Sequence, residues 1–514
     1  MDERIRELHA RRASARAMGG ADAIAQQHAR GKLTARERLD LLFDAGTFVE
    51  MGLLAHHQSL APDMAGRATP ADGVITGCGK INGRLACAAA YDFTVMAGSM
   101  GAIGERKVKR MREWALRQRV PMIWLIDSAG ARIQEAVGPW FPATGDLFFE
   151  EAIASGVIPQ VCAVMGPGVA GTAYIPGLAD FVVMVRGRSF LALGGPPLVK
   201  AAVGEDVDEE TLGGSRVHCE ISGVADLEVE DDPACIAAVK RYLSYFPSHN
   251  QEEPPCVEPR DDPLRPVEGL EQVVPTDPRR AYDMRQVITR VVDADTFFEI
   301  KPRFARNLIV GLARLGGRSV GVVANQPAHL GGVLDVDAAD KAARFIMTCD
   351  AFHIPLLFLV DTPGFIVGSR AEQQGIIRHG AKMLYAVSEA TVPKVTVVIR
   401  KAYGAGYYVM CGRAYEPDLI VAWPTAEIGV MGPEGAVNIL FRKEIAAAPD
   451  PDAARRAKLD EYRTRIAPYL AAEHAVVDDI IDPRETRAVA SRALELARTK
   501  RVERPWRKHG VMPV

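Results

Sequence analysis

Residues 121–130 read PMIWLIDSAG, and residues 355–364 read PLLFLVDTPG. Each stretch has an apolar run between a proline and an aspartate, and a glycine follows three positions after the aspartate. A short run that is apolar throughout, without alternation, is typical of a strand covered on both faces. The two stretches are 355 minus 121, or 234, residues apart, and their similarity indicates an internal repeat.

The repeat continues on both sides of these stretches at the same offset. The matched residues include Gly83 and Gly317, Gly98 and Gly332, Lys107 and Lys341, Pro159 and Pro393, and, after a four-residue insertion, Asp180 and Asp418. The polar, proline-rich stretch EEPPCVEPRDDPLRP at 252–266 is the expected linker. The sequence therefore predicts two domains with one fold, at residues 1–255 and 256–514.

Within each half, apolar β-branched runs alternate with helical patterns. The predicted strands are 122–126, 161–165 and 181–185, and then 356–360, 395–399 and 419–422. The helical patterns between them include 104–118 and 337–352. This order predicts an α/β fold. The charged segment before about residue 44 is expected to be a solvated helical extension or a subunit clamp, with Thr34 as a helix cap.

Composition narrows the class of protein. The 514 residues are 48% hydrophobic and 25% charged, with a net charge of -3, which gives no reason to expect nucleic acid as a partner. The eight cysteines form neither a CxxC pair nor a Cys/His cluster, so no metal site is expected, and reduced thiols indicate the cytoplasm. No apolar run reaches the ~18 residues of a membrane span, so no membrane association is predicted.

Each half has a turn of small residues where a strand should pass into a helix. These turns are GPGVAGT at 166–172 and AYGAG at 402–406. A helix start presents free N–H groups and the positive end of a dipole, and small residues allow a ligand oxygen to approach closely. Loops containing Gly98 and Gly332 could supply a facing lip in each half. Two such turns suit a reaction in which two different carbonyl oxygens become negatively charged.

Other catalytic patterns are missing or have simpler explanations. The chain has no GxSxG elbow and no GxxxxGK[ST] loop, which disfavours a serine hydrolase or an ATPase. The dipeptides at 127–128 and 361–362 are interpreted as caps of the following turns. His379 could act as a base, but a hydrogen-bonded structural histidine is preferred.

The sequence resembles the carboxyltransferase (β) subunits of biotin-dependent acyl-CoA carboxylases, from about residue 28 to residue 500. The matching segments include GKLTARERLDLLFD, YDFTVMAGSMG, DSAGARIQE, ASGVIPQ, DTPGF, GIIRHGAKMLYA and AYGAGYYVMCGRA. The resemblance implies a crotonase-like ββα superhelix in each half and a homohexamer built as a trimer of dimers. It also implies active sites between the N-terminal half of one subunit and the C-terminal half of its partner.

The resemblance also implies roles for individual residues. Amides of Ala170 and Gly171 would hold the thioester oxygen of an acyl-CoA, and residues 1–255 would form the acyl-CoA side. Amides of Ala405 and Gly406 would hold the ureido oxygen of biotin, and residues 256–514 would form the biotin side. Tyr408 would line the acyl pocket. Biotin would be carried on a separate biotin carboxylase or biotin carboxyl carrier subunit, because no Met-Lys-Met acceptor segment is present.

Three alternatives remain open at the level of sequence. The same half-reaction run backwards would make the chain the CoA-binding subunit of a sodium-pumping acyl-CoA decarboxylase. A crotonase-type hydratase would need two carboxylates acting on water. A catalytically silent scaffold would only organise partners. The acyl group is open too: Tyr408 and LGGPPLVKAA lean towards methylcrotonoyl-type enzymes, whereas DSAGARIQE and DTPGF lean towards propionyl-type enzymes.

Overall fold

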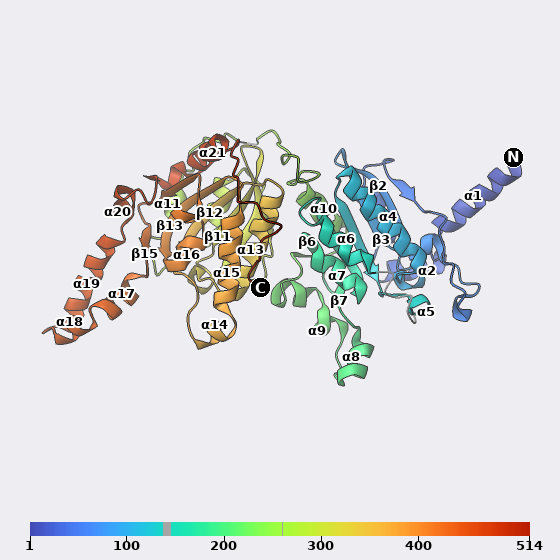
Figure 1. Ribbon diagram of the computed structural model, residues 1–514, viewed down its shortest axis with the longest axis horizontal. Helices are drawn as coiled ribbons and strands as arrows, with labels where there is room; N and C mark the ends of the chain where they lie inside the picture. The colour runs from blue at the N-terminus through green and yellow to red at the C-terminus, as the bar shows by residue number, and fades with distance from the viewer. Residues whose placement is uncertain (137–144, 260) are drawn as a thin grey trace. The chain divides into compact units, whose positions relative to one another are not determined.

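The computed structural model describes residues 1–136, 145–259 and 261–514, so position 260 of the expected linker lies outside the described residues. The chain divides into two compact units, Met1–Glu253 (unit 1) and Pro254–Val514 (unit 2). Each unit contains one eight-stranded sheet with helices packed on it (Figure 1).

The sheet of unit 1 has the strand order β1-β2-β3-β4-β5-β6-β8, with β7 paired to β5. Its strands are β1 (Val49–Met51), β2 (Val74–Ile81), β3 (Arg84–Tyr91), β4 (Met122–Ser128), β5 (Gln160–Val169), β6 (Phe181–Val185), β7 (Phe190–Ala192) and β8 (Leu227–Val229). Its helices are α1 (Asp2–Arg16), α2 (Ala21–Ala29), α3 (Ala35–Leu42), α4 (Ala102–Gln118), α5 (Ile133–Ala136), α6 (Asp146–Ala154), α7 (Gly171–Leu178), α8 (Pro196–Val203), α9 (Glu209–Gly213) and α10 (Asp232–Leu243).

Unit 2 repeats this arrangement in the order β16-β14-β13-β12-β11-β10-β9, with β15 paired to β13. Its strands are β9 (Phe298–Ile300), β10 (Leu308–Leu315), β11 (Arg318–Asn325), β12 (Leu356–Thr362), β13 (Lys394–Tyr403), β14 (Leu419–Ala422), β15 (Glu427–Gly429) and β16 (Asp479–Ile480). Its helices are α11 (Leu270–Val273), α12 (Arg285–Val291), α13 (Val336–Ala351), α14 (Ser369–Gln373), α15 (Ile376–Glu389), α16 (Gly404–Val409), α17 (Pro433–Leu440), α18 (Arg442–Ala447), α19 (Pro451–Arg465), α20 (Pro468–Glu473) and α21 (Thr486–Leu496).

In both sheets an antiparallel hairpin leads into parallel strands. The hairpins are β2–β3 and β10–β11, whereas β3–β4–β5–β6 and β11–β12–β13–β14 are parallel. Parallel strands need crossover connections, and α4 and α13 supply the first of these in each unit. The central strands β4 and β12 are buried at every residue, as expected for strands covered on both faces.

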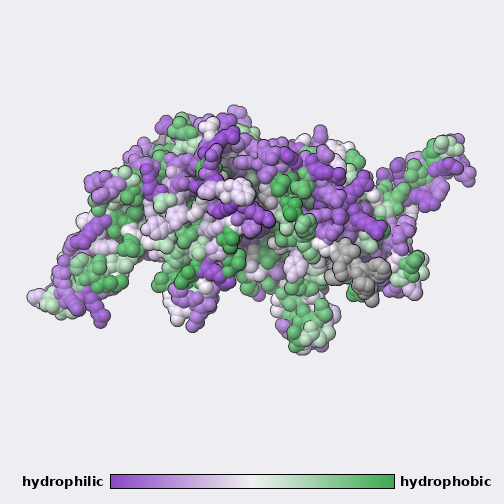
Figure 2. Space-filling model, in the orientation of Figure 1, coloured by the Kyte–Doolittle hydropathy of each residue, from purple (hydrophilic) through white to green (hydrophobic). Residues whose placement is uncertain are grey.

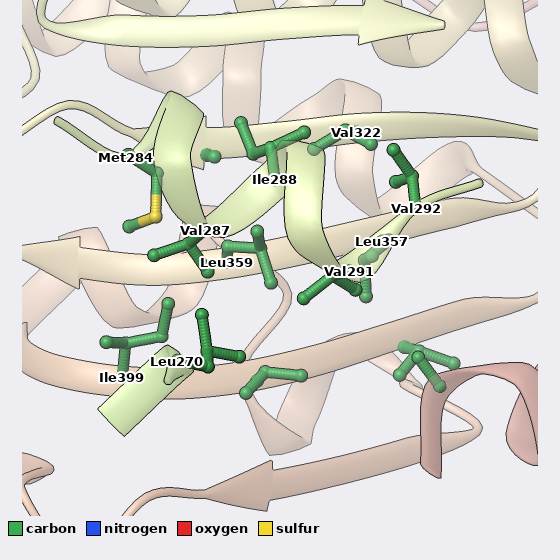
Figure 3. Close-up of a cluster of buried hydrophobic side chains, with 14 of the residues drawn as sticks. Leu270, Met284, Val287, Ile288, Val291, Val292, Val322, Leu357, Leu359 and Ile399 are labelled. Atoms are coloured by element: carbon green, nitrogen blue, oxygen red, sulfur yellow. The ribbon is translucent and has the colours of Figure 1, made fainter. Parts of the chain in front are cut away.

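The cores form where helices meet these buried strands. Figure 3 shows Val287, Ile288 and Val291 of α12 directed at strand side chains that include Leu357 and Leu359. Unit 1 has its own cluster, which includes Val108 of α4, Trp124 of β4 and Val164 of β5. Each unit therefore has a core of its own. Burial of each large apolar side chain in it stabilises the folded state by roughly 1.5 to 3 kcal/mol.

The duplication extends to the backbone conformation. Residues with positive φ recur at an offset of 234: Met96 and Leu330 (47° and 48°), Ala97 and Gly331 (53° and 63°), Gly98 and Gly332 (63° and 77°), Gly130 and Gly364 (90° and 112°), and Ala170 and Gly404 (both 55°). Positive φ is uncommon outside glycine, so its retention at non-glycine positions shows that both units keep the same turns.

Hydrophilic and hydrophobic residues are both present on the surface (Figure 2). Hydrophobic residues gather over α8, where the relative exposure of Leu198 is 60% and that of Val203 is 73%. Among the described residues, no helix combines the length and the apolar character that a membrane span requires.

Candidate active site

The two small-residue turns have the predicted strand-to-helix form. In unit 1, β5 ends at Val169, Ala170 takes φ 55° and ψ -118°, and α7 begins at Gly171. In unit 2, β13 ends at Tyr403 and α16 begins at Gly404, which also has a φ of 55°. The positive φ turns the chain sharply, so the first amides of each helix are not used by the preceding strand.

A buried aspartate stands beside each turn, at the end of the neighbouring parallel strand. Between β4 and β5 the register slips: Ile126 pairs with Val164, but Ser128 pairs with Gly168. Three residues of β5, 165–167, therefore face Asp127. Between β12 and β13 the same slip places residues 399–401 opposite Asp361. Such bulges redirect a strand, and here each one lies directly before the turn.

In unit 1 the charge of Asp127 is balanced by residues from the N-terminal segment. Lys32 Nζ lies 2.6 Å from Asp127 Oδ1, and Arg38 Nη1 lies 2.9 Å from Oδ2. Gln27 Nε2 also donates to Oδ2, at 2.9 Å. Arg38 reaches Asp232 as well, with Nε 2.7 Å from Oδ2. All these charged groups are buried, and desolvation lowers the pKa of Lys32.

In unit 2 the balancing charges come from β13 itself. Arg400 Nε lies 2.8 Å from Asp361 Oδ2, and Lys401 Nζ lies 3.6 Å from Oδ1. The backbone N–H of Lys401 also donates to Oδ1, at 3.3 Å. The two dipeptides that begin with Asp127 and Asp361 therefore do more than cap the following turns, because each aspartate is the centre of a buried ionic network.

The loops predicted as facing lips are the 3-10 turns at Met96–Gly98 and Leu330–Gly332. A Cβ at Gly98 would lie 2.2 Å from the carbonyl oxygen of Asp127, and one at Gly332 would lie 2.5 Å from that of Asp361. Only glycine allows this approach. In unit 1 the lip is also joined to the strand end by a hydrogen bond from Ala129 N–H to the carbonyl of Ala97, at 2.9 Å.

Hydrogen bonding distinguishes some of the amides at each turn from others. The N–H of Ala170 donates to the carbonyl of Ala192, at 3.0 Å. Those of Gly98 and Gly332 donate within their own turns, to Val95 and His329, both at 3.0 Å. Among the described residues, no acceptor is found for the N–H groups of Ala97 and Gly171 or of their counterparts Gly331 and Ala405.

The predicted pairs of amides are therefore not equivalent between the units. At the offset of 234, Gly171 corresponds to Ala405, whereas Gly406 corresponds to Thr172. A Cβ at Gly406 would lie 2.8 Å from Gly364 Cα, so close backbone packing alone explains this glycine. A Cβ at Gly171 would only touch Met100 Sδ, at 3.7 Å, and Phe148 Cζ, at 3.8 Å.

Two other candidate side chains lie in unit 2. Tyr408 belongs to α16 and has 47% of its surface exposed, with its ring centroid 6.1 Å from that of Tyr415. His379 in α15 has Nδ1 2.9 Å from both carboxylate oxygens of Asp340, which supports its interpretation as a structural histidine. Among the described residues, no His, Cys, Asp and Glu side chains gather at metal-binding distances.

Sequence reasoning missed Lys32 and Arg38. The segment was expected to be solvated or to clamp a subunit, and α1 indeed has no buried residue. Lys32 and Arg38, in contrast, are only 6% and 1% exposed. The sequence signal was Arg38 on the same helical face as the apolar Leu42, because a charge on an apolar face usually has a buried partner.

The carboxyl transferase domain family matches residues 26–512. The chain belongs to this family. The carboxyltransferase subunit of propionyl-CoA carboxylase from Haloferax mediterranei is 47% identical over 515 residues, which cover 100% of both chains. The methylmalonyl-CoA decarboxylase subunit alpha of Propionigenium modestum is 45% identical over 513 residues, which cover 100% of this chain and 99% of that one.

A solved structure shows the same fold in a carboxyl transferase. Transcarboxylase 12S, solved as a hexamer assembly with methylmalonyl-coenzyme A and methylmalonic acid bound, has a TM-score of 0.96 at 47% identity over 100% of this chain and 98% of that one. The predicted α/β fold of two crotonase-like domains is confirmed, as is the prediction of a carboxyltransferase of the acyl-CoA carboxylase class.

Proposed function

We propose that this carboxyl transferase moves a carboxyl group between biotin on a separate subunit and a short-chain acyl-CoA, with propionyl-CoA and methylmalonyl-CoA as the acyl pair. The observation that carries the proposal is the duplicated turn: among the described residues, each unit has unpaired N–H groups at a helix start, including those of Gly171 and Ala405, and another on the loop predicted as the facing lip. The acyl pair is favoured by two relatives: one is named propionyl-CoA carboxylase, and the other is a solved structure with methylmalonyl-CoA bound.

In unit 1 the ligand oxygen would be that of the thioester. The N–H of Gly171 donates to it, and the N–H of Ala97 faces it from the lip. Ala170 shapes the turn through its positive φ, and Gly98 keeps the lip against β4. Each preorganised donor aimed at an oxygen that becomes anionic contributes about 3 to 4 kcal/mol to the transition state. The α-carbon next to the thioester then loses its proton more readily.

In unit 2 the corresponding oxygen would be the ureido oxygen of biotin. The N–H groups of Ala405 and Gly331 are the donors, whereas Gly406 and Gly332 are required by backbone packing. These unpaired N–H groups can donate to a neutral oxygen that becomes negatively charged during the reaction. Carboxylated biotin would supply the CO2, and the ureido anion left after CO2 departs would take the α-proton, so no side-chain base would be needed. Tyr408, on α16 directly after this turn, would line the acyl pocket.

The proposal extends to partners and compartment. A biotin carboxylase or biotin carboxyl carrier subunit would present biotin to unit 2, and unit 1 would hold the acyl-CoA. A homohexamer would complete the sites, and the 12S relative is described as a hexamer assembly. The eight free cysteines suit the reducing cytoplasm.

A second candidate function is decarboxylation. Two relatives named methylmalonyl-CoA decarboxylase subunit alpha, from Propionigenium modestum and Veillonella parvula, are each 45% identical over the whole chain. The chemistry at both turns is the same in either direction, so the partner subunits would set the direction.

Carboxyl exchange between free biotin and a panel of thioesters tests the proposal without the partner subunit. We expect exchange with methylmalonyl-CoA to exceed exchange with malonyl-CoA and 3-methylglutaconyl-CoA. A preference for 3-methylglutaconyl-CoA would contradict the assignment of propionyl-CoA and methylmalonyl-CoA as the acyl pair. No exchange with any thioester by a folded protein that still binds a biotinylated carrier would favour a scaffold instead.

A further inference from the structure

The cations around the two buried aspartates come from different parts of the chain. Asp127 and Asp361 are equivalent, but position 166 in the β5 bulge is glycine where the β13 bulge has Arg400. A Cβ at Gly166 would lie 2.0 Å from Asp127 Oδ1 and 2.7 Å from Lys32 Nζ. The place of a side chain from β5 is thus taken by the Asp127 carboxylate and the Lys32 ammonium group.

In unit 2 the segment before the sheet makes a different kind of contact with the cation. Arg400 Nη1 donates to the carbonyls of Pro275, Asp277 and Arg280, at 3.1, 3.1 and 3.0 Å. In unit 1 the N-terminal segment provides the cations themselves, and Arg38 Nη2 also donates to the carbonyl of Met165 in the β5 bulge, at 3.2 Å.

The same N-terminal segment also contacts the facing lip of unit 1. Lys32 Nζ lies 4.4 Å from the centre of the Phe93 ring, three residues before Met96. The N–H of Gly19 donates to Thr94 Oγ1, at 3.0 Å. One segment therefore touches both structures that carry the unpaired amides of unit 1: the loop leading to Ala97 and the bulge leading to Gly171.

We propose that Lys32 and Arg38 are positioning residues of the acyl-CoA side, which act through Asp127 to fix the β5 turn as Arg400 does for β13. The inference rests on the proposed function, because it assigns the β5 turn to the acyl thioester. It makes acyl transfer depend on docking of the N-terminal segment, although none of its residues is proposed to touch the substrate.

Stability alone does not test this role, because removing one partner of a buried ion pair is strongly destabilising whatever that partner does for catalysis. The informative variants are Lys32→Met in unit 1 and Arg400→Met in unit 2, with Arg186→Met as the control. The Arg186 side chain is 56% exposed and lies 2.9 Å from the buried carboxylate of Glu228 and 2.7 Å from the exposed one of Glu230. The assay is carboxyl transfer from methylmalonyl-CoA to free biotin by the full-length protein, with KM measured for both.

We expect Lys32→Met to lower kcat/KM for methylmalonyl-CoA at least about tenfold, while the KM for biotin stays within about twofold. Arg400→Met should change the KM for biotin instead. Lys32→Arg, which retains the charge, should recover part of the activity. Equal changes in both KM values for Lys32→Met, or wild-type kinetics, would overturn the inference.

If Lys32→Met does not fold, Gln27→Leu gives a milder test, because it removes a neutral donor to Asp127 and leaves both cations. We expect a smaller loss of the same kind, confined to the acyl substrate, and wild-type values would overturn the inference. Propionyl-CoA binding, measured by calorimetry, separates the two hypotheses. Weakened binding by the variant supports the inference even if the wild type transfers nothing to biotin, a result that would refute only the proposed function.

Discussion

Asp127 and Asp361 occupy the same point in two separate sheets, each at 0% exposure and each opposite a three-residue bulge of the next parallel strand. Their carboxylates bind cations from different sources, yet the turns that follow have the same backbone form. A charge buried this deeply is strongly destabilising if its partner is removed. Both turns are therefore held rigidly, which suits groups that must be preorganised before a reaction.

Gly171→Val is expected to reduce transfer strongly, by at least about 100-fold, without unfolding the protein. The branched side chain would enter the space beside Met100 and Phe148 and would crowd the N–H of Gly171, to which the thioester oxygen is proposed to bind. Loss of one donor contact corresponds to a fall of roughly 100-fold to 1,000-fold in kcat. Gly177→Ala in the same helix, where an added Cβ meets nothing within 4 Å, is the control. Full activity of folded Gly171→Val would remove this turn from the site.

Ala405→Val and Gly406→Ala should separate catalysis from packing in unit 2. Ala405→Val is expected to reduce transfer, because the N–H of Ala405 is proposed to face biotin. The Tm should change little. Gly406→Ala should lower the free energy of unfolding by about 1 to 3 kcal/mol, because its Cβ would press on Gly364 Cα. Thermal melting and exchange with free biotin would measure both. If Gly406→Ala reduced transfer while Ala405→Val lowered the Tm, the ligand contact would belong to Gly406.

Tyr408→Asp is expected to change acyl preference more than stability. The side chain is 47% exposed, and substitution of exposed residues usually changes the free energy of unfolding by no more than about 0.5 kcal/mol. The measurement is the ratio of kcat/KM values for propionyl-CoA, acetyl-CoA and 3-methylcrotonoyl-CoA. Tyr415→Phe, which keeps the neighbouring ring, is the control. Unchanged ratios would exclude Tyr408 from the acyl pocket.

Stability should depend on pH through Glu105 in α4. Burial raises the pKa of Glu105 to about 7 from an ordinary value near 4.5. The folded state then binds more protons than the unfolded state between these values, so the free energy of unfolding falls as pH rises from about 4.5 to about 7. The loss is at most about 3 kcal/mol, at 1.36 kcal/mol per pH unit.

Denaturant unfolding at pH 5 and pH 8 measures this effect. Glu105→Gln should reduce the difference between the two pH values, whereas Glu113→Gln, on the exposed side of the same helix, should leave it unchanged. Equal pH dependence in wild type and Glu105→Gln would show that other groups cause it.

One thiol per chain should react rapidly with a thiol reagent. Cys256 is exposed, whereas the other seven cysteines are buried, and burial raises the pKa of thiols such as Cys162 and Cys349. Absorbance titration should give one fast equivalent in the native protein and eight after denaturation. Cys256→Ser should abolish the fast phase, and several fast equivalents in that variant would indicate that a core opens readily.

The sequence by itself did not predict the hairpins β2–β3 and β10–β11, but it determined the duplication, the buried central strands of each half and the two turns. These features follow from local patterns, such as the apolar runs at 122–126 and 356–360, and from small residues where the backbone needs positive φ or close approach. The resemblance to carboxyltransferase subunits added the enzyme class, because the matching segments are long and specific.

Only the tertiary structure decided which backbone N–H groups of each turn are unpaired and which cations pair with the aspartate beside it. Every residue except proline carries a backbone N–H, so the sequence could not show that the amide of Ala170 is paired with Ala192 while that of Gly171 is free. Lys32 and Asp127 are 95 residues apart, and no periodic pattern links them. Their contact exists because folding of the N-terminal segment onto β4 and β5 buries both charges, and buried opposite charges must be paired.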